Sequence, residues 1–246
     1  RFIESTMDYA ILNYSGNNWQ CGAGIAYWLQ QNGMKPGDTV VTLYGDNGTV
    51  CKYREEGFRD FLKGNIDYSD KATGKSYHTT EVWTDAQLDP VFNTYSVVCN
   101  WSADGAYDYL EQKLDEIVAK ADTNLYIYSM DDEMTFGMLN LIEGSSLSAA
   151  TKAKLETLNV YISAIGGMQE LYDVMSGKAE QAKVANQYFD DMMSVYFSPS
   201  MMKSVIDKMV DFLGGNWTYK NGDVDTEPVW IVNRQNVNQY EGFLGH

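Results

Sequence analysis

Histidine, cysteine and basic residues are scarce in this chain of 246 residues. The two histidines, His78 and His246, leave little scope for a histidine-based metal site or catalytic triad. The three cysteines are too few and too irregularly spaced for a disulfide framework or a zinc site. Each of them falls in a predicted helix or strand, so we expect buried free thiols at Cys21, Cys51 and Cys99.

The shortage of basic residues makes the chain strongly acidic. It has 18 Lys and Arg against 34 Asp and Glu, a formal net charge of −16 at pH 7. Such a protein lacks the basic face that nucleic-acid phosphates require, so we expect no nucleic-acid partner. No hydrophobic run approaches the length of a membrane span, and no signal peptide is recognisable. Because the chain begins with Arg1 and not with methionine, we expect that an upstream segment has been removed.

Three motifs of nucleotide-binding and hydrolytic enzymes are missing. There is no GxxxxGK[ST] phosphate-binding loop and no GxSxG nucleophile elbow. A GxGxxG fingerprint is absent as well, because Gly22 and Gly24 lie inside a helical pattern and not at a turn between a strand and a helix. These absences favour a protein that uses no cofactor.

What the chain does contain is an alternation of strand-like and helical segments. Short runs rich in β-branched and aromatic residues alternate at least five times with segments whose apolar residues recur at helical spacing. This order predicts an α/β fold, a parallel sheet with helices on both faces. Residues 64–93 interrupt it as a polar insertion, with one short strand expected around 79–83. The predicted strands are residues 7–12, 39–44, 95–99, 125–129, 160–165, 192–197 and 228–232, and the predicted helices are residues 19–31, 50–62, 104–120, 148–158, 169–175 and 201–213, with another helix after Asp132.

Three residues lie just beyond predicted strands, at the carboxyl edge where ligands bind in open α/β sheets. Asp131 and Trp101 each follow a strand closely, and Arg54 comes one turn after the loop that ends another. An arginine fork, a carboxylate acceptor and an aromatic face are what a sugar ring requires. Alternatives remain open: Arg54 as a surface salt-bridge partner of Glu55 or Glu56, and Trp101 as a core residue.

Asp131 and Asp132 stand together where a strand ends and a helix begins. Adjacent residues of an extended chain point apart, whereas paired catalytic carboxylates converge on one bond, so we expect no catalytic role for the pair. One aspartate is enough to cap the helix, where it would contribute about 1 kcal/mol. The other needs a further reason, and a ligand rich in hydroxyl groups is one.

The remaining acidic segments invite comparison with calcium sites. Asp67, Asp70 and the turn 223–227 lack the ordered DxDxDG register with a closing glutamate. We therefore expect solvated loop charge at these positions, and no bound metal.

Taken in order, these segments resemble the sugar-binding proteins of bacterial ABC transporters, in the ribose- and galactose-binding type of fold called periplasmic-binding-protein-like class I. The matches span nearly the whole chain. The segment Asn17-Asn18-Trp19-Gln20-Cys21-Gly22 with Leu29 is similar to the family's motif DNxxxG…L, and Arg54-Glu55-Glu56-Gly57-Phe58 is similar to its motif RxxGF. The segment Asn100-Trp101-Ser102 is similar to its aromatic element, and Met130-Asp131-Asp132-Glu133-Met134 with Gly137 is similar to its motif QNDEMALG. Ser198-Pro199 and residues 228–233 match as well.

The resemblance implies roles for individual residues. Arg54 would bind the sugar, the ring of Trp101 would stack on it, and Asp131 would accept its hydroxyl groups. Asn18, in the first motif, belongs to the same site. Asp132 is then left as the cap of the following helix.

The chain departs from the family's pattern at two ligand positions. Gly166 stands where the family often has the aspartate of GxDG, and Phe197 falls near a position often taken by Asn or Gln. Both departures suggest a less polar or differently shaped sugar site.

A larger departure concerns the first lobe, most of which the resemblance implies is absent. Residues 1–198 would form the second lobe, residues 199–226 a returning fragment of the first, and residues 227–246 a final strand and tail in the second. Helix 201–213 would present an apolar face without its usual partners. We expect it to dock on a second copy or on a separately retained N-terminal fragment.

The implied function is a solute-binding protein that captures a sugar and delivers it to an ABC permease, without chemistry. We expect it in the periplasm or outside the cell, as a membrane-anchored lipoprotein of a Gram-positive organism. The alternative is a sugar-sensing effector domain of a transcriptional regulator, or the ectodomain of a sensor kinase, which share this fold. A sugar-active enzyme that uses Asp131 is the third reading.

Overall fold

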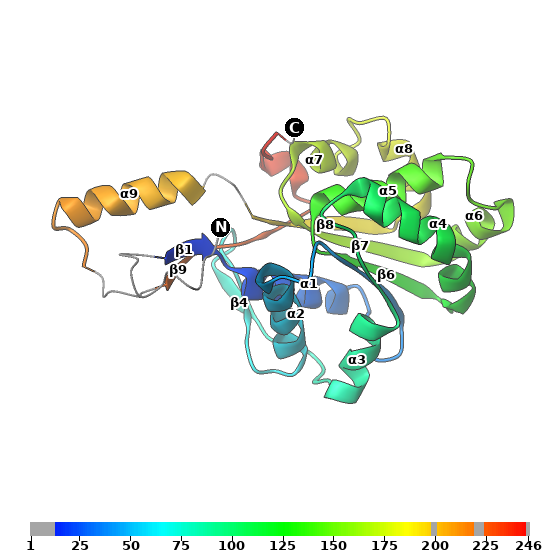
Figure 1. The fold of residues 1–246 in the computed structure, drawn as a ribbon, viewed down its shortest axis with the longest axis horizontal. Helices are drawn as coiled ribbons and strands as arrows, with labels where there is room; N and C mark the ends of the chain where they lie inside the picture. Colours follow the sequence, from blue (N-terminus) through cyan, green and yellow to red (C-terminus); the bar gives the residue numbers. More distant parts are fainter. Residues whose placement is uncertain (1–12, 198–200, 219–223, 245–246) are drawn as a thin grey trace.

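The computed structural model describes residues 13–197, 201–218 and 224–244, around a six-stranded sheet with the order β10-β8-β7-β6-β2-β5 (Figure 1). Five of these strands run parallel, and β10 is antiparallel to β8 at one edge. The predicted α/β fold is confirmed, with a sheet that is mainly parallel. The strands are β2 (Thr39–Tyr44), β5 (Tyr95–Val98), β6 (Asn124–Ser129), β7 (Asn159–Gly166), β8 (Asp191–Tyr196) and β10 (Ile231–Asn233).

Helices cover both faces of this sheet, as predicted (Figure 1). One face carries α1 (Asn18–Gln31), α2 (Thr49–Leu62) and α3 (Asp85–Asn93). The other carries α4 (Ala103–Lys120), α5 (Asp132–Glu143), α6 (Ala149–Leu155), α7 (Gln169–Met175) and α8 (Ala182–Tyr188). A short 3₁₀ helix, η2 (Val237–Gln239), follows β10.

The core lies between these layers. Leu125, Tyr126, Ile127 and Tyr128 of the inner strand β6 have no exposed surface, because strands flank β6 and helices cover it above and below. A strand that is buried on both faces has a nearly continuous run of apolar residues in its sequence. The three cysteines are free and buried in the same core, as predicted.

Helices α1 and α2 touch through glycine. A Cβ atom on Gly22 would lie 1.9 Å from the backbone oxygen of Arg54, and one on Gly57 would lie 2.0 Å from that of Trp19. The two backbones can approach this closely only because neither glycine has a side chain. This contact brings Arg54 of α2 beside Asn18, the first residue of α1.

Within the polar insertion 64–93, the predicted short strand was wrong. No strand lies at residues 79–83; this part of the chain forms the hairpin of β3 (Tyr68–Asp70) and β4 (Lys75–Tyr77), then helix α3. The side chains of Thr84 and Gln87 form a capping box that begins α3, which accommodates Pro90 within it. Three-residue strands are too short for their periodicity to be recognised in the sequence.

Asp70 is not solvated loop charge. It is 8% exposed, and its Oδ1 accepts hydrogen bonds from the backbone N–H and the hydroxyl of Thr73 (2.8 and 3.0 Å). Its Oδ2 accepts from Tyr68 Oη at 2.9 Å and from the backbone N–H of Ile231 at 3.3 Å. The carboxylate closes the β3–β4 turn and ties it to the last sheet strand.

The predicted last strand, residues 228–232, forms only in part, because β10 begins at Ile231, and a strand that was not predicted lies before it in the acidic turn. Strand β9 (Val224–Glu227) pairs in parallel with β1 (Asn13–Gly16) outside the main sheet, and β10 joins the sheet edge three residues later. The predicted strand 7–12, Asp223 of the acidic turn and the Ser198-Pro199 match lie outside the described residues.

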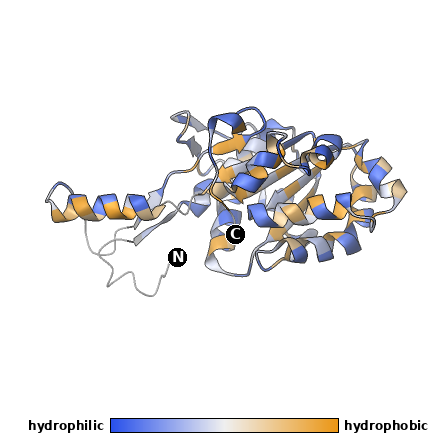
Figure 2. Ribbon diagram, turned by 90° about the horizontal axis from the view of Figure 1, so that it is seen from above, coloured by the Kyte–Doolittle hydropathy of each residue, from blue (hydrophilic) through white to orange (hydrophobic). Residues whose placement is uncertain are grey.

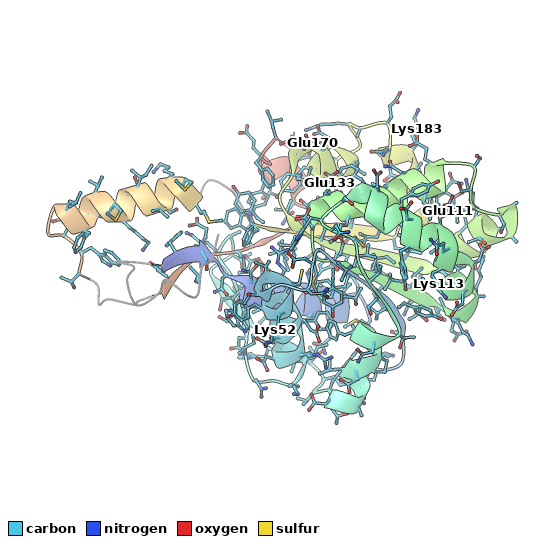
Figure 3. All side chains as sticks on the ribbon, in the orientation of Figure 1. Lys52, Glu111, Lys113, Glu133, Glu170 and Lys183 are labelled. Carbon is cyan, nitrogen blue, oxygen red and sulfur yellow. The ribbon has the colours of Figure 1, made fainter. Side chains whose placement is uncertain are left out.

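Helix α9 (Met201–Leu213) projects from the body beyond the β1–β9 ribbon (Figure 1). None of its residues is buried, and hydrophobic and hydrophilic positions alternate along it (Figure 2). All its side chains stand clear of the main body (Figure 3). Its exposed apolar stripe consists of Met202 (63% exposed), Ile206 (57%), Val210 (62%) and Leu213 (78%).

Candidate functional site

Arg54 lies at the centre of the candidate site. Its side chain is buried, with 3% of the residue exposed, which excludes the surface salt bridge. Its Nε donates to Oδ1 of Asn18 at 3.0 Å, and its Nη1 donates to the backbone oxygen of Met130 at the carboxyl end of β6. Glu55 pairs with Arg59 instead. The guanidinium is therefore held at the sheet edge where ligands bind in this class of fold.

Two aromatic rings lie over the guanidinium of Arg54. Its Cζ atom is 5.6 Å from the ring centroid of Trp101 and 5.2 Å from that of Phe197. Both distances are within the range of cation–π attraction. Trp101 is half-buried and packs against the core from its margin, so it is not one of the buried core residues. The ring of Phe197 also lies against Gly16, where a Cβ atom would come within 1.7 Å of it.

The backbone at Trp101 is unusual. Asn100 and Trp101 have φ angles of 54° and 57°, in the left-handed region that costs non-glycine residues about 1–2 kcal/mol each. Ser102 then caps α4, its hydroxyl accepting from the N–H of Gly105 at 3.1 Å. This sharp reversal leaves Trp101 at the carboxyl end of β5, facing Arg54.

The predicted capping role of Asp132 was wrong, because Asp131 is the cap. Oδ1 of Asp131 accepts from the N–H of Glu133 at 3.0 Å, and α5 begins at Asp132. Burial raises the pKa of Asp131, while that N–H and the charge of Arg54 oppose the rise. Asp131 is thus close enough to Arg54 to interact with it. Its predicted role as a ligand acceptor stays a prediction.

Asp132 points into the protein and has no exposed surface. Its Oδ2 accepts from the N–H groups of Gly167 (2.6 Å) and Met168 (2.8 Å), and its Oδ1 accepts from Ser194 Oγ (2.7 Å). Burial raises its pKa to about 7 in spite of these donors. The carboxylate, which follows β6, joins the carboxyl end of β7 to the middle of β8.

Gly166 makes room for that carboxylate. A Cβ atom on Gly166 would lie 2.7 Å from Oδ2 of Asp132. The backbone oxygen of Gly166 accepts from the N–H of Phe197 at 2.7 Å. Five of the six predicted site residues thus lie at or next to Arg54, and the sixth, Gly166, is hydrogen-bonded to one of them, Phe197.

Known proteins match this chain in fold but not in sequence. No protein-family model and no curated protein sequence matches the chain. Among solved structures, the periplasmic binding protein of the arabinose ABC transporter from Shewanella sp. ANA-3, bound to L-arabinofuranose, matches with a TM-score of 0.60 and 15% identity, over 93% of this chain and 61% of that one. The chain has the fold of periplasmic sugar-binding proteins.

Two further structures agree. An ABC transporter solute-binding protein from Bacillus halodurans C-125 with bound myo-inositol matches with a TM-score of 0.61 and 14% identity, over 98% of this chain and 67% of that one. One from Actinobacillus succinogenes 130z with bound D-allose matches at 0.57 and 17%, over 93% and 64%. The chain therefore spans about two thirds or less of the length of these sugar-binding proteins.

We call Arg54 and the site residues around it, Asn18, Trp101, Asp131 and Phe197, the Arg54 cluster. Two surface hollows flank it. One, of about 440 Å³, is lined by Asp46, Cys51 and Glu55 among others. The other, of about 550 Å³, is lined by Glu133, Phe136 and Met168 among others. Neither is lined by Arg54 or Trp101, because side chains of the protein itself fill the space over the guanidinium.

Metal-binding clusters and membrane-spanning helices were sought in all the described residues. Among the residues that the structure describes, no three or more His, Cys, Asp or Glu side chains gather where they could hold a metal ion. In the same residues, no helix is both long and apolar enough to cross a membrane.

Several residues of the site were not predicted. Met130 contributes only its backbone oxygen, and Ser194 contributes a hydroxyl from the middle of a strand, so neither gives a sequence signal. Asp46 is different, because it follows β2 at the same carboxyl edge as Arg54 and accepts a hydrogen bond from the Trp101 indole. The rule that identified Trp101 and Asp131 would have identified it too.

Proposed function

We propose that the protein binds a sugar at the Arg54 cluster and serves as the solute-binding component of an ABC importer, without chemistry of its own. The observation that carries this proposal is the convergence of Arg54, Asn18, Asp131 and Trp101 at one sheet edge, in a fold found among sugar-binding proteins. The buried, fully engaged carboxylate of Asp132 cannot converge with Asp131 on a substrate. This geometry disfavours an acid–base pair.

The polar atoms of Arg54 and Asp131 that are not used in hydrogen bonds within the protein indicate which ligand groups the site could bind. The hydrogen bonds of Arg54 to described residues use Nε and Nη1, which leaves Nη2 for a ligand oxygen. The cap uses Oδ1 of Asp131 and leaves Oδ2 for a hydroxyl group. Trp101 supplies an aromatic face for the ring of the sugar. Because Arg54 is only 3% exposed, Phe197 or Trp101 must shift when the ligand enters.

The wall formed by Phe197 and Gly166 is less polar than the rest. Gly166 offers no side-chain acceptor, and the space where one would lie is taken by the carboxylate of Asp132. Phe197 offers only an apolar ring. We therefore propose a sugar that presents fewer hydroxyl groups to this side than to the side of Asp131 and Asn18.

The wider setting belongs to the same proposal. We propose that residues 1–198 and 227–246 belong to a second lobe, that residues 199–226 return from a first lobe, and that closure of the two lobes completes the site. The sugar would pass to an ABC permease. The protein would act in the periplasm or outside the cell, anchored as a lipoprotein in a Gram-positive organism.

Calorimetry with pentoses, hexoses and short oligosaccharides tests the function. We expect the bare chain to bind weakly or not at all, since the two-lobe proposal assigns one wall of the site to the first lobe, and the intact protein to bind one class of sugar. Asp131→Ser in the intact protein keeps a side-chain oxygen for the cap and loses the carboxylate. It should weaken sugar binding at least about tenfold, as expected for a lost hydrogen bond to a charged group, with unfolding free energy nearly unchanged.

Asp38→Asn serves as the matched control. Asp38 also accepts a backbone N–H, from Lys35 at 2.8 Å, but it lies at the opposite, amino end of β2. Removal of its charge should leave affinity unchanged. Micromolar binding by the bare chain would contradict the two-lobe proposal, and full affinity of Asp131→Ser would contradict the role of Asp131.

A further inference from the structure

The ring of Trp101 is held by the loop between β2 and α2. Its indole Nε1–H donates to Oδ2 of Asp46 at 3.0 Å. The other carboxylate oxygen of Asp46, Oδ1, accepts from the backbone N–H of Gly48 at 2.7 Å. The ring also packs on Gly45, where a Cβ atom would come within 2.1 Å of it. Both oxygens of Asp46 are therefore engaged, one with its own loop and one with the indole.

Trp101 needs such support because its own backbone does not provide it. It follows another residue with a positive φ, and the chain turns directly into α4. In this region of φ and ψ a large side chain is rarely found, so contacts outside the local segment must determine where the ring lies. The loop contacts from Gly45 and Asp46 are close enough to do this.

We infer that Asp46 is a positioning residue for sugar binding: it acts through Trp101 and does not touch the ligand. This inference rests on the proposed function of Trp101 as the stacking surface. A hydrogen bond to a carboxylate is charge-assisted and directional. With the indole fixed before the ligand arrives, the ligand is spared the entropy of ordering that ring, which corresponds to about three- to tenfold in affinity.

The first test measures the indole directly, in the chain as it is and without a ligand. The ¹⁵N-indole resonance of Trp101 is assigned from its loss in Trp101→Phe. We expect this N–H to exchange slowly with solvent, and to exchange at least about tenfold faster in Asp46→Asn. Gly48 and the indole donate to different oxygens of Asp46, at 2.7 and 3.0 Å, and asparagine has an acceptor at only one of these positions; with that oxygen kept by the shorter bond to Gly48, the amide NH₂ group would face the indole N–H. Asp38→Asn is the matched control and should leave the resonance unchanged. An unchanged Trp101 resonance in Asp46→Asn overturns the inference.

The second test is a double-mutant cycle on sugar affinity in the intact protein. Asp46→Asn should weaken binding about three- to tenfold when Trp101 is present, for the reason above. In the Trp101→Phe background, which has no indole N–H, it should have no further effect. Independent, multiplying effects would show that Asp46 acts on the ligand or on the fold, and would overturn the inference. If no variant binds sugar, the proposed function fails, while the indole measurement still decides the role of Asp46.

Discussion

Arg54 is a buried guanidinium whose hydrogen bonds within the chain go to neutral groups. Its acceptors are an amide oxygen and a backbone oxygen, and two rings lie over it. In the part of the chain that the structure describes, no ion pair within 4.0 Å involves Arg54. A buried charge normally requires a charged partner. A guanidinium that makes no direct ion pair, with the carboxylate of Asp131 nearby, is suited to a neutral, hydroxyl-rich ligand, which adds acceptors without requiring a further counter-charge.

Asp132 contributes to stability and not to the ligand surface. In Asp132→Ala the N–H groups of Gly167 and Met168 and the hydroxyl of Ser194 lose their acceptor in a buried place. We expect a loss of about 3 kcal/mol in unfolding free energy, measured by urea titration. Asp132→Asn keeps an acceptor oxygen and can donate to Ser194, so its loss should be much smaller. Equal losses in the two variants would contradict this account.

The pH dependence follows from the raised pKa of Asp132. An aspartate in the unfolded chain releases its proton near pH 4, whereas Asp132 in the folded protein does so at about 7. Between these values the folded state holds the extra proton, so the unfolding free energy falls as pH rises, by up to ~4 kcal/mol. The difference in unfolding free energy between wild type and Asp132→Asn isolates this contribution. A difference that grows with pH would show the opposite sign.

At the scale of elements, the contact between α1 and α2 positions the site. Gly57→Ala should lower unfolding free energy by about 2 kcal/mol, because the new methyl group would overlap the backbone of Trp19. The gain of about 1 kcal/mol in helix propensity from glycine to alanine is too small to offset this. Lys52→Ala, at an exposed position of the same helix (Figure 3), should change stability by less than about 0.5 kcal/mol. A Gly57→Ala protein more stable than wild type would contradict the contact.

The sequence predicts elements where periodicity is long and burial is uniform. The run 125–129 and the helix 169–175 were predicted almost to the residue, because a fully enclosed strand and an amphipathic helix have distinct patterns. The β3–β4 hairpin could not be predicted, since Asp70 stabilises it partly through Ile231, distant in the chain. Which of two adjacent aspartates caps α5 depends on the residue at which the helix begins, and residue order alone cannot decide that.

The site residues also divide into those that the sequence predicts and those whose contacts depend on packing. Arg54, Trp101 and Asn18 were predicted from their place at strand ends and from the resemblance, and the structure brings them together. That Gly166 makes room for the carboxylate of Asp132 is a contact between two strand ends, and no pattern along one segment reveals it. Sequence position gives the edge of the sheet, but the pairwise contacts across it depend on packing.

At the scale of the whole molecule, the chain consists of a well-packed body and an extension with little support. The β1–β9 ribbon connects the body to α9, and Asn17 of the body donates to Thr226 of the ribbon at 3.2 Å. Lys208 of α9 forms an ion pair with Asp225. These are few and partly exposed contacts for a thirteen-residue helix. The stripe of Met202, Ile206, Val210 and Leu213 therefore faces solvent unless something covers it.

We expect the bare chain to associate through this stripe at high concentration, since burial of each aliphatic side chain contributes about 1.5–3 kcal/mol. Sedimentation velocity over a range of concentrations measures the association. Ile206→Lys combined with Val210→Lys should leave the chain monomeric, because two charges would then enter the contact. Lys203→Gln, on the same helix but at an exposed polar position, is the control and should associate like wild type.

The N-terminal lobe that we propose for the intact protein, prepared separately, would distinguish the two proposed occupants. If that lobe covers the stripe, its addition should replace the self-associated form by a one-to-one complex, and the doubly substituted chain should not bind it. If a second copy is the occupant, the association of the chain should be unaffected. A wild-type chain that stays monomeric at every concentration and does not bind the lobe would show that the stripe on α9 is not a docking surface.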